Sequence, residues 1–271
     1  MRPGVNSSAL HIFQILRIVS AASAPLNHAE ISRRSGLPSS TVYRALGTLE
    51  EAQYVQRSST SLSYEAGIVP QLLVWTLLRR FPVSLASLPF LSQLSELSGE
   101  TVSLSGRIGW YGVRLSVVYG GNDIYHRDRV GEISLLHTDL SSRGIFAFLS
   151  DDEIDRYRRF VLRHHEAYAR EIDKPALRRE VRAARESGYV LVSDAQAPLL
   201  SIPISGNGSE VIASIALRGP ASMQDRELPP TWKQICERLT EQLRRDGQAT
   251  AGPFSHLEPD QIVLKLPARA D

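Results

Sequence analysis

Few residues of this 271-residue chain could do catalytic or metal chemistry. The candidates are an H-x-D pair, His137 and Asp139, the adjacent His164 and His165, and the single cysteine, Cys236. Catalysis or metal binding would need such groups to converge on one point. The histidine pair lies in RRFVLRHHEAYARE, whose charges are typical of a solvated helix face. The cysteine lies among apolar residues at helical spacing, which favours a packed core thiol over a nucleophile.

Signature motifs of enzymes are missing from the sequence. We find no G-x-S-x-G elbow, no H-E-x-x-H helix and no G-x-x-x-x-G-K-[ST] loop. The sequence therefore predicts no catalytic residue, no metal site and no cofactor. A hydrolytic enzyme is kept as an alternative class.

A different kind of chemistry is available in SGLPSSTVYRALGTLEE, residues 35–51. Val42, Leu46 and Leu49 recur at i, i+4 and i+7, which marks the buried side of a helix. Short hydroxyls, an aromatic ring and a guanidinium occupy the opposite side and the first turn: Ser39, Ser40, Thr41, Tyr43 and Arg44. Such groups can approach base edges and phosphates in a major groove.

Two shorter helices are expected to position this one. Residues 8–21 read as a largely apolar helix that Pro25 breaks. Asn27 with Glu30 forms a capping pair that opens the helix AEISRRS, and Gly36 ends it. Pro38 suits the first turn of the next helix. The pattern predicts a helix-turn-helix.

A two-stranded wing is expected after these helices. YVQR (54–57) and LSYEA (62–66) flank the polar turn SSTS, and Arg57 is placed to meet backbone phosphate. The alternative is a three-helix core with an ordinary solvated face.

Charge alone does not identify a nucleic-acid-binding protein here. The net charge is +2, and residues 1–66 hold six arginines and no lysine against four glutamates. Since strong phosphate binders concentrate more charge, one monomer is expected to bind DNA weakly. Specific binding would need two or more copies on double-stranded DNA with a two-fold symmetric site.

Composition is that of an ordinary globular protein, with 42% hydrophobic and 22% charged residues. A single cysteine excludes an internal disulfide framework and fits a reducing cytoplasm. No apolar run is long enough to span a bilayer, and the N-terminal apolar patch, interrupted by Gln14 and Arg17, reads as a helix instead of a signal peptide. We therefore expect a cytoplasmic protein without a membrane partner.

The run AEISRRSGLPSSTVYRALGTLEEAQYVQR closely resembles the winged helix-turn-helix of IclR-type bacterial transcriptional regulators. Further blocks match the same family: RVGEISLLHTDLSSRGIFAFLS (129–150), ALRREVRAARESGYV (176–190) and IASIALRGPAS (212–222). The resemblance covers about residues 8–245. It implies a ligand-responsive, sequence-specific DNA-binding regulator, either repressor or activator, that works as a homodimer or a dimer of dimers.

The resemblance also implies an α+β fold with a GAF-like, mixed α/β effector-binding domain. The sequence agrees, since β-rich runs at 101–107, 113–119, 189–194 and 211–218 alternate with or flank helices at 140–149, 175–187 and 231–245. The expected domains are a winged helix-turn-helix (1–66), a linker helix (67–82), the effector domain (83–246) and a poorly ordered tail (247–271).

The linker region is unusually apolar. Its large side chains are Leu72, Leu73, Val74, Trp75, Leu77 and Leu78. We favour a helix at a dimer contact over purely internal packing.

Block alignment with the family implies six positions at or beside the effector pocket: Asp139, Leu140, Ser141, Leu199, Ala216 and Arg218. The pocket type of the family is not carried over intact, because SDAQAPLLSIPI is shorter than the matching block and lacks its glycine and cysteine. His137 and Asp139 fall at a strand-to-helix corner, where we expect an imidazole bonded to backbone and a carboxylate that caps the helix.

A buried arginine in such a pocket needs an acidic partner. If Asp139 caps its helix, Arg218 could clamp a small organic acid, with Leu140 and Leu199 as an apolar wall. If Asp139 pairs with Arg218 instead, the pocket is closed and the domain does not respond to a ligand. A slip of one residue along the strand would turn Arg218 to solvent.

Overall fold

The computed structural model describes residues 6–58, 62–78, 82–121, 129–192, 198–206, 210–218, 228–246, 258–264 and 266. The side chains of Trp75, Leu77, Leu78, Pro82 and Arg218 lie outside this description. The chain forms two compact units, residues 1–77 and 78–271. The division falls inside the segment expected to be a linker.

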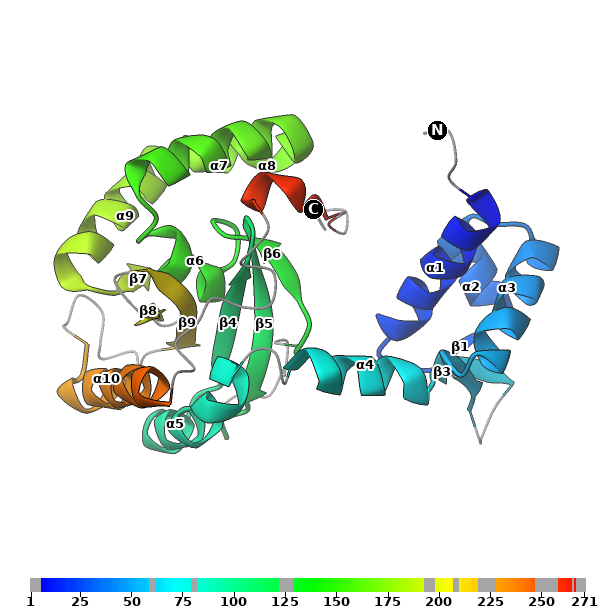
Figure 1. Ribbon diagram of the computed structural model, residues 1–271, viewed down its shortest axis with the longest axis horizontal. Coiled ribbons are helices and arrows are strands. Elements are labelled where there is room, and N and C mark those ends of the chain that lie inside the picture. The colour runs from blue at the N-terminus through cyan, green and yellow to red at the C-terminus, as the bar shows by residue number, and fades with distance from the viewer. Residues whose placement is uncertain are drawn as a thin grey trace. The chain divides into compact units, whose positions relative to one another are not determined.

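Three helices and a small sheet make up the first unit (Figure 1). The helices are α1 (Ser7–Ser20), α2 (His28–Ser35) and α3 (Ser39–Glu51). The sheet has the order β1-β3-β2, with β1 at Leu26–Asn27, β2 at Val55–Arg57 and β3 at Ser63–Ala66. Helix α4 (Ile68–Leu78) follows. The helix-turn-helix and its wing are confirmed.

Local capping sets the ends of these helices. The Asn27 side chain accepts a hydrogen bond from the Glu30 amide at 2.9 Å, and Gly36 adopts the left-handed φ of +67° that favours glycine after a helix. Both agree with the sequence. Pro38 differs by one position: it precedes α3 with an extended ψ of 142°, and the helix begins at Ser39.

The core of the first unit collects the apolar side of each helix. Val42, Leu46 and Leu49 of α3 are buried together with residues of α1, α2 and the sheet. Removing each such side chain from water contributes about 1.5–3 kcal/mol to stability. In α1 the apolar residues divide between core and surface, since Ile15 is buried whereas Phe13 is 64% exposed.

The second unit is built on one six-stranded sheet with the order β6-β5-β4-β9-β8-β7. Its strands are β4 (Val102–Ile108), β5 (Tyr111–Val118), β6 (Ile133–Leu135), β7 (Val190–Val192), β8 (Leu199–Ser205) and β9 (Val211–Arg218). Every strand pairing in the described residues is antiparallel. Strands β6 and β8 were not predicted from the sequence, and residues 193 and 194 of the expected third run lie outside the described residues.

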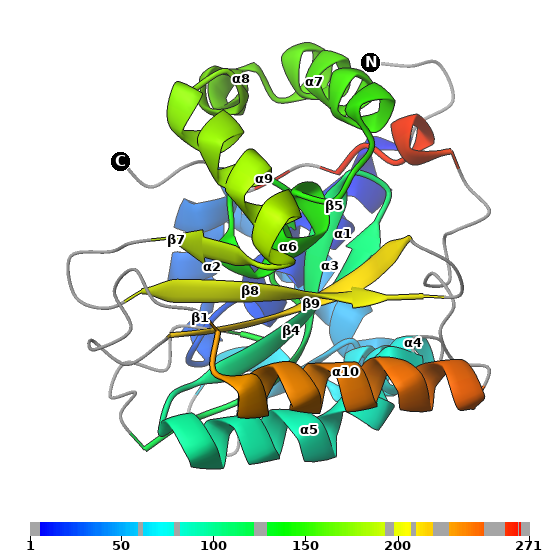
Figure 2. The same cartoon turned by 90° about the vertical axis from the view of Figure 1, so that its left-hand side faces the viewer.

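Helices cover both faces of this sheet (Figure 2). Helices α5 (Pro82–Ser98) and α10 (Pro230–Arg245) pack side by side on one face. The other face carries α6 (Leu140–Phe146), followed by α7 (Asp151–His164), α8 (Glu166–Ile172) and α9 (Pro175–Ser187). Because both faces are covered, β9 is buried from Val211 to Leu217. The α+β class is confirmed.

Helix α6 lies unusually close to the sheet. A Cβ atom at Gly144 would stand 2.4 Å from the Ser201 hydroxyl and 2.8 Å from Cβ of Ser214. Only glycine fits there, and its amide donates to the Ser201 hydroxyl at 3.1 Å. The close approach fixes the second half of α6 over the sheet.

Part of the segment expected to be a poorly ordered tail packs against the second unit. Residues 247–257 lie outside the described residues, but Ile262, Leu264 and Leu266 contact the apolar cluster around Trp110 and Tyr111. The backbone of Leu264 donates to the Tyr111 hydroxyl at 2.9 Å. We call residues 258–264 and 266 the C-terminal strap.

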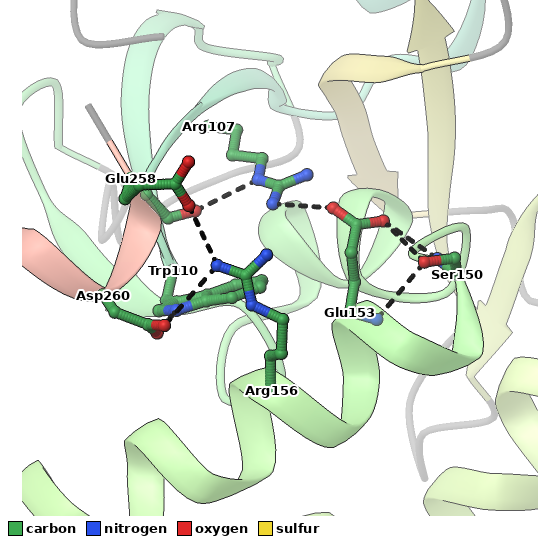
Figure 3. A network of polar contacts seen from close by, with 8 residues as sticks. Arg107, Trp110, Ser150, Glu153, Arg156, Glu258 and Asp260 are labelled. Atoms are coloured by element: carbon green, nitrogen blue, oxygen red, sulfur yellow. Dashed lines mark hydrogen bonds and ion pairs between the residues drawn. The ribbon is translucent and has the colours of Figure 1, made fainter. Parts of the chain in front are cut away.

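Polar contacts fasten the strap to the turn between β4 and β5 (Figure 3). The fully buried Trp110 donates its indole N–H to Asp260 at 2.6 Å. Arg156 of α7 lies over the indole ring and pairs with Glu258 at 3.0 Å and with Asp260 at 3.5 Å. On the same ring, Arg107 pairs with Glu153 of α7 at 3.0 Å. The strap therefore completes a polar cover over Trp110.

Asp260 is the acceptor on which the buried indole depends. We expect Asp260→Ala to lower the unfolding free energy of the second unit by about 1–2 kcal/mol, because it leaves the Trp110 N–H without its acceptor. Glu258→Ala is the matched control. It removes an exposed carboxylate that pairs with Arg156, as Asp260 also does, and should cost less than about 0.5 kcal/mol. Chemical denaturation followed by fluorescence measures both, and equal losses would contradict this role of Asp260.

Candidate functional site

The outer face of α3 is open in the first unit. Ser39, Ser40, Tyr43 and Arg44 are exposed and Thr41 is half-buried, so the predicted face exists. The Tyr43 side chain is 67% exposed although it is large and aromatic. Among the described residues, no carboxylate pairs with Arg44. The guanidinium is therefore available to an external anion.

The amino end of α3 adds backbone donors to that face. Pro38 provides no side-chain cap, and the first turn holds no acidic residue. The first amide N–H groups of a helix lack partners within it, and together with the helix dipole they favour phosphate. Backbone N–H groups and hydroxyls thus point out of the same turn.

Hydrogen bonds hold the turn before α3 in place. Gln14 of α1 donates to the carbonyl of Ser35 at 2.8 Å, and the Ser32 hydroxyl donates to the carbonyl of Leu37 at 2.8 Å. The Ser35 hydroxyl also accepts from the Leu37 amide at 3.3 Å. These bonds set the angle between α2 and α3 without using the outer face of α3.

Arg57 in the wing is less available than Arg44. Its Nε donates to Glu50 at 3.1 Å, and its guanidinium lies over the Tyr64 ring at 5.6 Å from the centroid. Both members of the ion pair are partly exposed, so the pairing is weak. A phosphate would have to compete with Glu50 for this arginine.

The second unit contains a buried ionic cluster at the start of α6. Arg114 of β5 is only 5% exposed. Its guanidinium pairs with Glu132, donates to Asp139 at 3.2 Å and donates to the Ser141 hydroxyl at 2.9 Å. Burying a guanidinium is costly unless several acceptors surround it, which is the case here.

This cluster corrects the role predicted for Asp139. The residue stands at the N-cap position of α6, but its carboxylate makes no capping hydrogen bond. It accepts from Arg114 and from the Ser141 hydroxyl instead. A charged donor outcompetes a backbone amide for the carboxylate because charge-assisted bonds are stronger.

A small cavity adjoins the cluster. Its volume is about 60 Å³, and its lining is polar apart from one isoleucine and one glycine: Ser105, Gly112, Arg114, Glu132, Ile133, Ser134 and Asp139. This volume holds about two water molecules at liquid density. The site as described is small, polar and acidic on balance.

The six residues expected at an effector pocket do not all meet at this cavity. Asp139 lines it and Ser141 bonds to its arginine. Leu140 packs towards Ala147 and Val190. Leu199 of β8 is half-buried and Ala216 of β9 is buried, and neither lines the described cavity. The Arg218 side chain lies outside the described residues, so the arginine that meets Asp139 is Arg114.

Sequence reasoning missed Arg114. The signal was present: a charge at the second position of VRLSVVY, a run otherwise typical of a buried strand. An arginine in a strand that is covered on both faces needs acidic or polar partners close to it in the fold.

Comparison with family models decides what these two sites belong to. Residues 8–59 match the IclR helix-turn-helix domain, and residues 76–245 match the C-terminal domain of the bacterial transcriptional regulator IclR. The chain belongs to the IclR family of bacterial transcriptional regulators. The resemblance seen in the sequence is confirmed.

The curated relatives are transcriptional regulators, and the similarity extends over most of their length. The probable transcriptional regulator SauR of Cupriavidus necator is 29% identical over 79% of this chain and 86% of its own. The regulator XynR of Escherichia coli is 23% identical over 85% of this chain and 93% of its own. The repressor AllR of Escherichia coli is 24% identical over 77% and 78%.

Solved IclR structures share the fold. The IclR of Thermotoga maritima superposes with a TM-score of 0.66 at 22% identity, over 88% of this chain and 98% of that one. An IclR homologue of Microbacterium hydrocarbonoxydans, solved in complex with 4-hydroxybenzoate, gives a TM-score of 0.69 at 18% identity, over 90% and 100%.

No helix in the described ranges is long and apolar enough to cross a bilayer.

The histidines that could have signalled an enzyme are structural in this IclR-family chain. His137 is buried, with Nδ1 at 2.6 Å from the Tyr157 hydroxyl and Nε2 at 3.2 Å from the Tyr168 carbonyl, so the expected bond to backbone is present. Burial raises the pKa of Tyr157 well above its ordinary value, which keeps the phenol a neutral donor.

His165 is not the solvated residue that the sequence indicated. It is half-buried, and its Nε2 lies 2.7 Å from the Tyr111 hydroxyl. Burial, with a smaller contribution from His164, lowers the pKa of His165, so the ring is held neutral as part of the packing beneath the C-terminal strap. His164 is exposed, as expected.

Cys236 is the core thiol that the sequence predicted. It is 3% exposed on α10. Burial, with a smaller contribution from Glu237, raises the pKa of its thiol to about 12, so no thiolate forms near neutral pH.

Proposed function

We propose that this IclR-family regulator binds a two-fold symmetric operator as a dimer or a dimer of dimers, and that a small organic acid in the effector domain changes its affinity for that operator. It acts in the cytoplasm and carries out no reaction. The proposal rests on the outer face of α3, where exposed hydroxyls and the first helix amides lie near Arg44, which pairs with no carboxylate of the described residues.

The residue types on that face support division of labour between base and phosphate contacts. Arg44 lies one turn into α3, where a guanidinium can read guanine. Ser39, Ser40 and Thr41 surround the amino end, which suits phosphate contacts. Tyr43 offers an exposed ring and hydroxyl beside them. Arg57 supplies a further phosphate contact once it leaves Glu50.

Self-association is supported by α4 and by charge. The helix is largely apolar, and Ile68, Leu72, Leu73 and Val74 are each 48–57% exposed in the described chain. An apolar helix of this kind needs cover. Residues 1–66 carry a net charge of only +2. Specific binding therefore also requires two DNA-binding units on one operator.

The effector class follows from the ionic cluster. Arg114 is a buried cation beside a polar cavity, and its fork geometry suits a carboxylate. A structural relative binds 4-hydroxybenzoate, which is such an acid. The competing candidate is a domain that does not respond to ligands, which is favoured by the 60 Å³ volume of the cavity and by the two carboxylates that Arg114 already holds.

Arg44 and Arg57 should affect DNA binding differently. We expect Arg44→Ala to cost about 1–3 kcal/mol on the cognate operator and far less on random DNA, because a base contact is lost. Arg57→Ala should weaken all sequences about equally. Fluorescence anisotropy at moderate salt measures both, with Arg179→Ala, an exposed arginine of the second unit, as control. No preference of the wild type for its own promoter region would overturn the proposal.

Leu73 tests the assignment of α4 to a self-association surface. We expect Leu73→Glu to convert a dimer or tetramer into a smaller species at micromolar concentration, since it places a charge in an apolar contact. Gln71→Glu adds the same charge about half a turn away on the same helix and should leave the assembly intact. Sedimentation velocity distinguishes the two, and a monomeric wild type would exclude this part of the proposal.

A carboxylate screen separates the responsive from the non-responsive domain. We expect at least one aromatic or aliphatic carboxylate, with 4-hydroxybenzoate among those tested, to change operator affinity about 5- to 150-fold. The matching amide, 4-hydroxybenzamide for that acid, should have no effect. If no acid changes operator affinity, the effector domain is non-responsive, although DNA binding itself stands.

A further inference from the structure

Two carboxylates share one buried guanidinium in the second unit. Arg114 is 6% exposed at its side chain, whereas Glu132 is 54% and Asp139 is 33% exposed. Counted over the described residues, the cluster therefore carries one positive and two negative charges. It contains one carboxylate more than the charge of the arginine requires.

The two carboxylates are not equally held. Asp139 accepts from Arg114 through both oxygens, at 3.2 and 3.3 Å, and also accepts from the Ser141 hydroxyl. Glu132 contacts Nη1 of Arg114 and projects from the sheet edge with half of its side chain in solvent. Glu132 is thus the carboxylate that can leave at the lower cost.

Departure of Glu132 needs only a side-chain rotation. Its backbone is fixed to β5, since the Arg114 amide donates to the Glu132 carbonyl at 2.9 Å and the Gly131 amide donates to the Arg114 carbonyl at 2.8 Å. Next to it, Ile133 pairs in register with Val113. The sheet edge can keep its hydrogen bonds while the carboxylate swings out.

An incoming acid could not simply join the cluster. A third carboxylate around one guanidinium would add like-charge repulsion beside a buried arginine. It would also lack space, since the cavity holds about 60 Å³ while both acidic side chains line it. One resident carboxylate has to go.

We propose that Glu132 is a built-in carboxylate that occupies the anion position on Arg114, and that an acidic effector binds by displacing it. The inference rests on the proposed organic-acid effector and specifies how the site admits it. Glu132 occupies the contact at Nη1 of Arg114 when no effector is present. Glu132 also sets a threshold of affinity for the effector, because the effector must compete with a carboxylate that is covalently part of the chain. Only an acid that binds Arg114 better than Glu132 does is admitted.

Chemical rescue tests the exchange without knowledge of the natural effector. Glu132→Ala removes the CH₂–COO⁻ end of the side chain, which acetate can replace. We expect saturable stabilisation of the Glu132→Ala protein by sodium acetate in thermal unfolding at constant ionic strength, about threefold or more larger than that of the wild type. Acetamide, the neutral analogue, should give no such difference.

The matched control is Glu241→Ala. Glu241 also pairs with an arginine, Arg245, but that arginine is 74% exposed. Its loss leaves no buried cation, so acetate should stabilise this variant no more than the wild type. Equal responses of the wild type, Glu132→Ala and Glu241→Ala would overturn the exchange.

A second variant covers the case in which Glu132→Ala does not fold. Glu132→Gln keeps the shape and hydrogen-bonding ability but removes the charge, so acetate has only a neutral amide to displace. We expect its acetate-dependent stabilisation to exceed that of the wild type as well. No excess in either folded variant would contradict the proposal.

The outcome is separable from that of the proposed function. If an acid that changes operator affinity binds the wild type and Glu132→Gln equally well, an organic-acid effector stands and the exchange is wrong. If acetate rescues Glu132→Ala but no acid changes operator affinity, the anion site is real and the regulatory proposal fails. For an acid that does bind, the exchange predicts about tenfold tighter binding to Glu132→Gln.

Discussion

A guanidinium buried in a sheet must keep its acceptors close, and the polar architecture of the second unit follows from that requirement. Arg114 draws one carboxylate from the edge strand side and one from the start of α6, and the hydroxyl of Ser141 completes the set. Asp139 is thereby taken from the capping role that its position would otherwise give it. The start of α6 is held by a charge in β5 as well as by its own helical hydrogen bonds. A ligand that alters the partners of Arg114 would act on both elements together.

Close packing around α6 makes such a change consequential. The helix approaches the sheet so tightly that Gly144 faces Ser201 and Ser214 with no room for a methyl group. Interiors of this density do not deform continuously. A shift at the start of α6 therefore either moves the neighbouring strands with it or does not occur. At the start of β5, Tyr111 and the preceding Trp110 are fixed by the C-terminal strap, which lies beyond the residues matched by the family model. Strand β5, which carries Arg114, is thus constrained at the ionic cluster and at its first residue.

The first unit solves a different problem, which is to read DNA with little charge. Its proposed recognition face carries short hydroxyls, helix amides and Arg44, which pairs with no carboxylate of the described residues, while Arg57 is partly neutralised by Glu50. Such a face gives weak attraction to the phosphate backbone in general and leaves discrimination to a few directed contacts. In the proposed dimer, affinity comes from a second copy, and the exposed apolar side chains of α4 provide the surface on which the copies meet.

The sequence determined the helix-turn-helix almost completely. Its capping pair, its left-handed glycine and its i, i+4, i+7 stripe act within a few residues, so the fold of the first unit and the outer face of α3 could be predicted, with Pro38 displaced by one position. The tertiary structure alone decided the partners of Arg114, which stand 18 and 25 residues away, and the docking of the strap, in which Asp260 meets Trp110 across 150 residues. The short strand β6 and strand β8, which had no strong local signal, also became visible only there. The physical reason is that capping and periodicity are local, whereas the neighbours of a buried charge are set by strand register and by the close packing of a helix on a sheet.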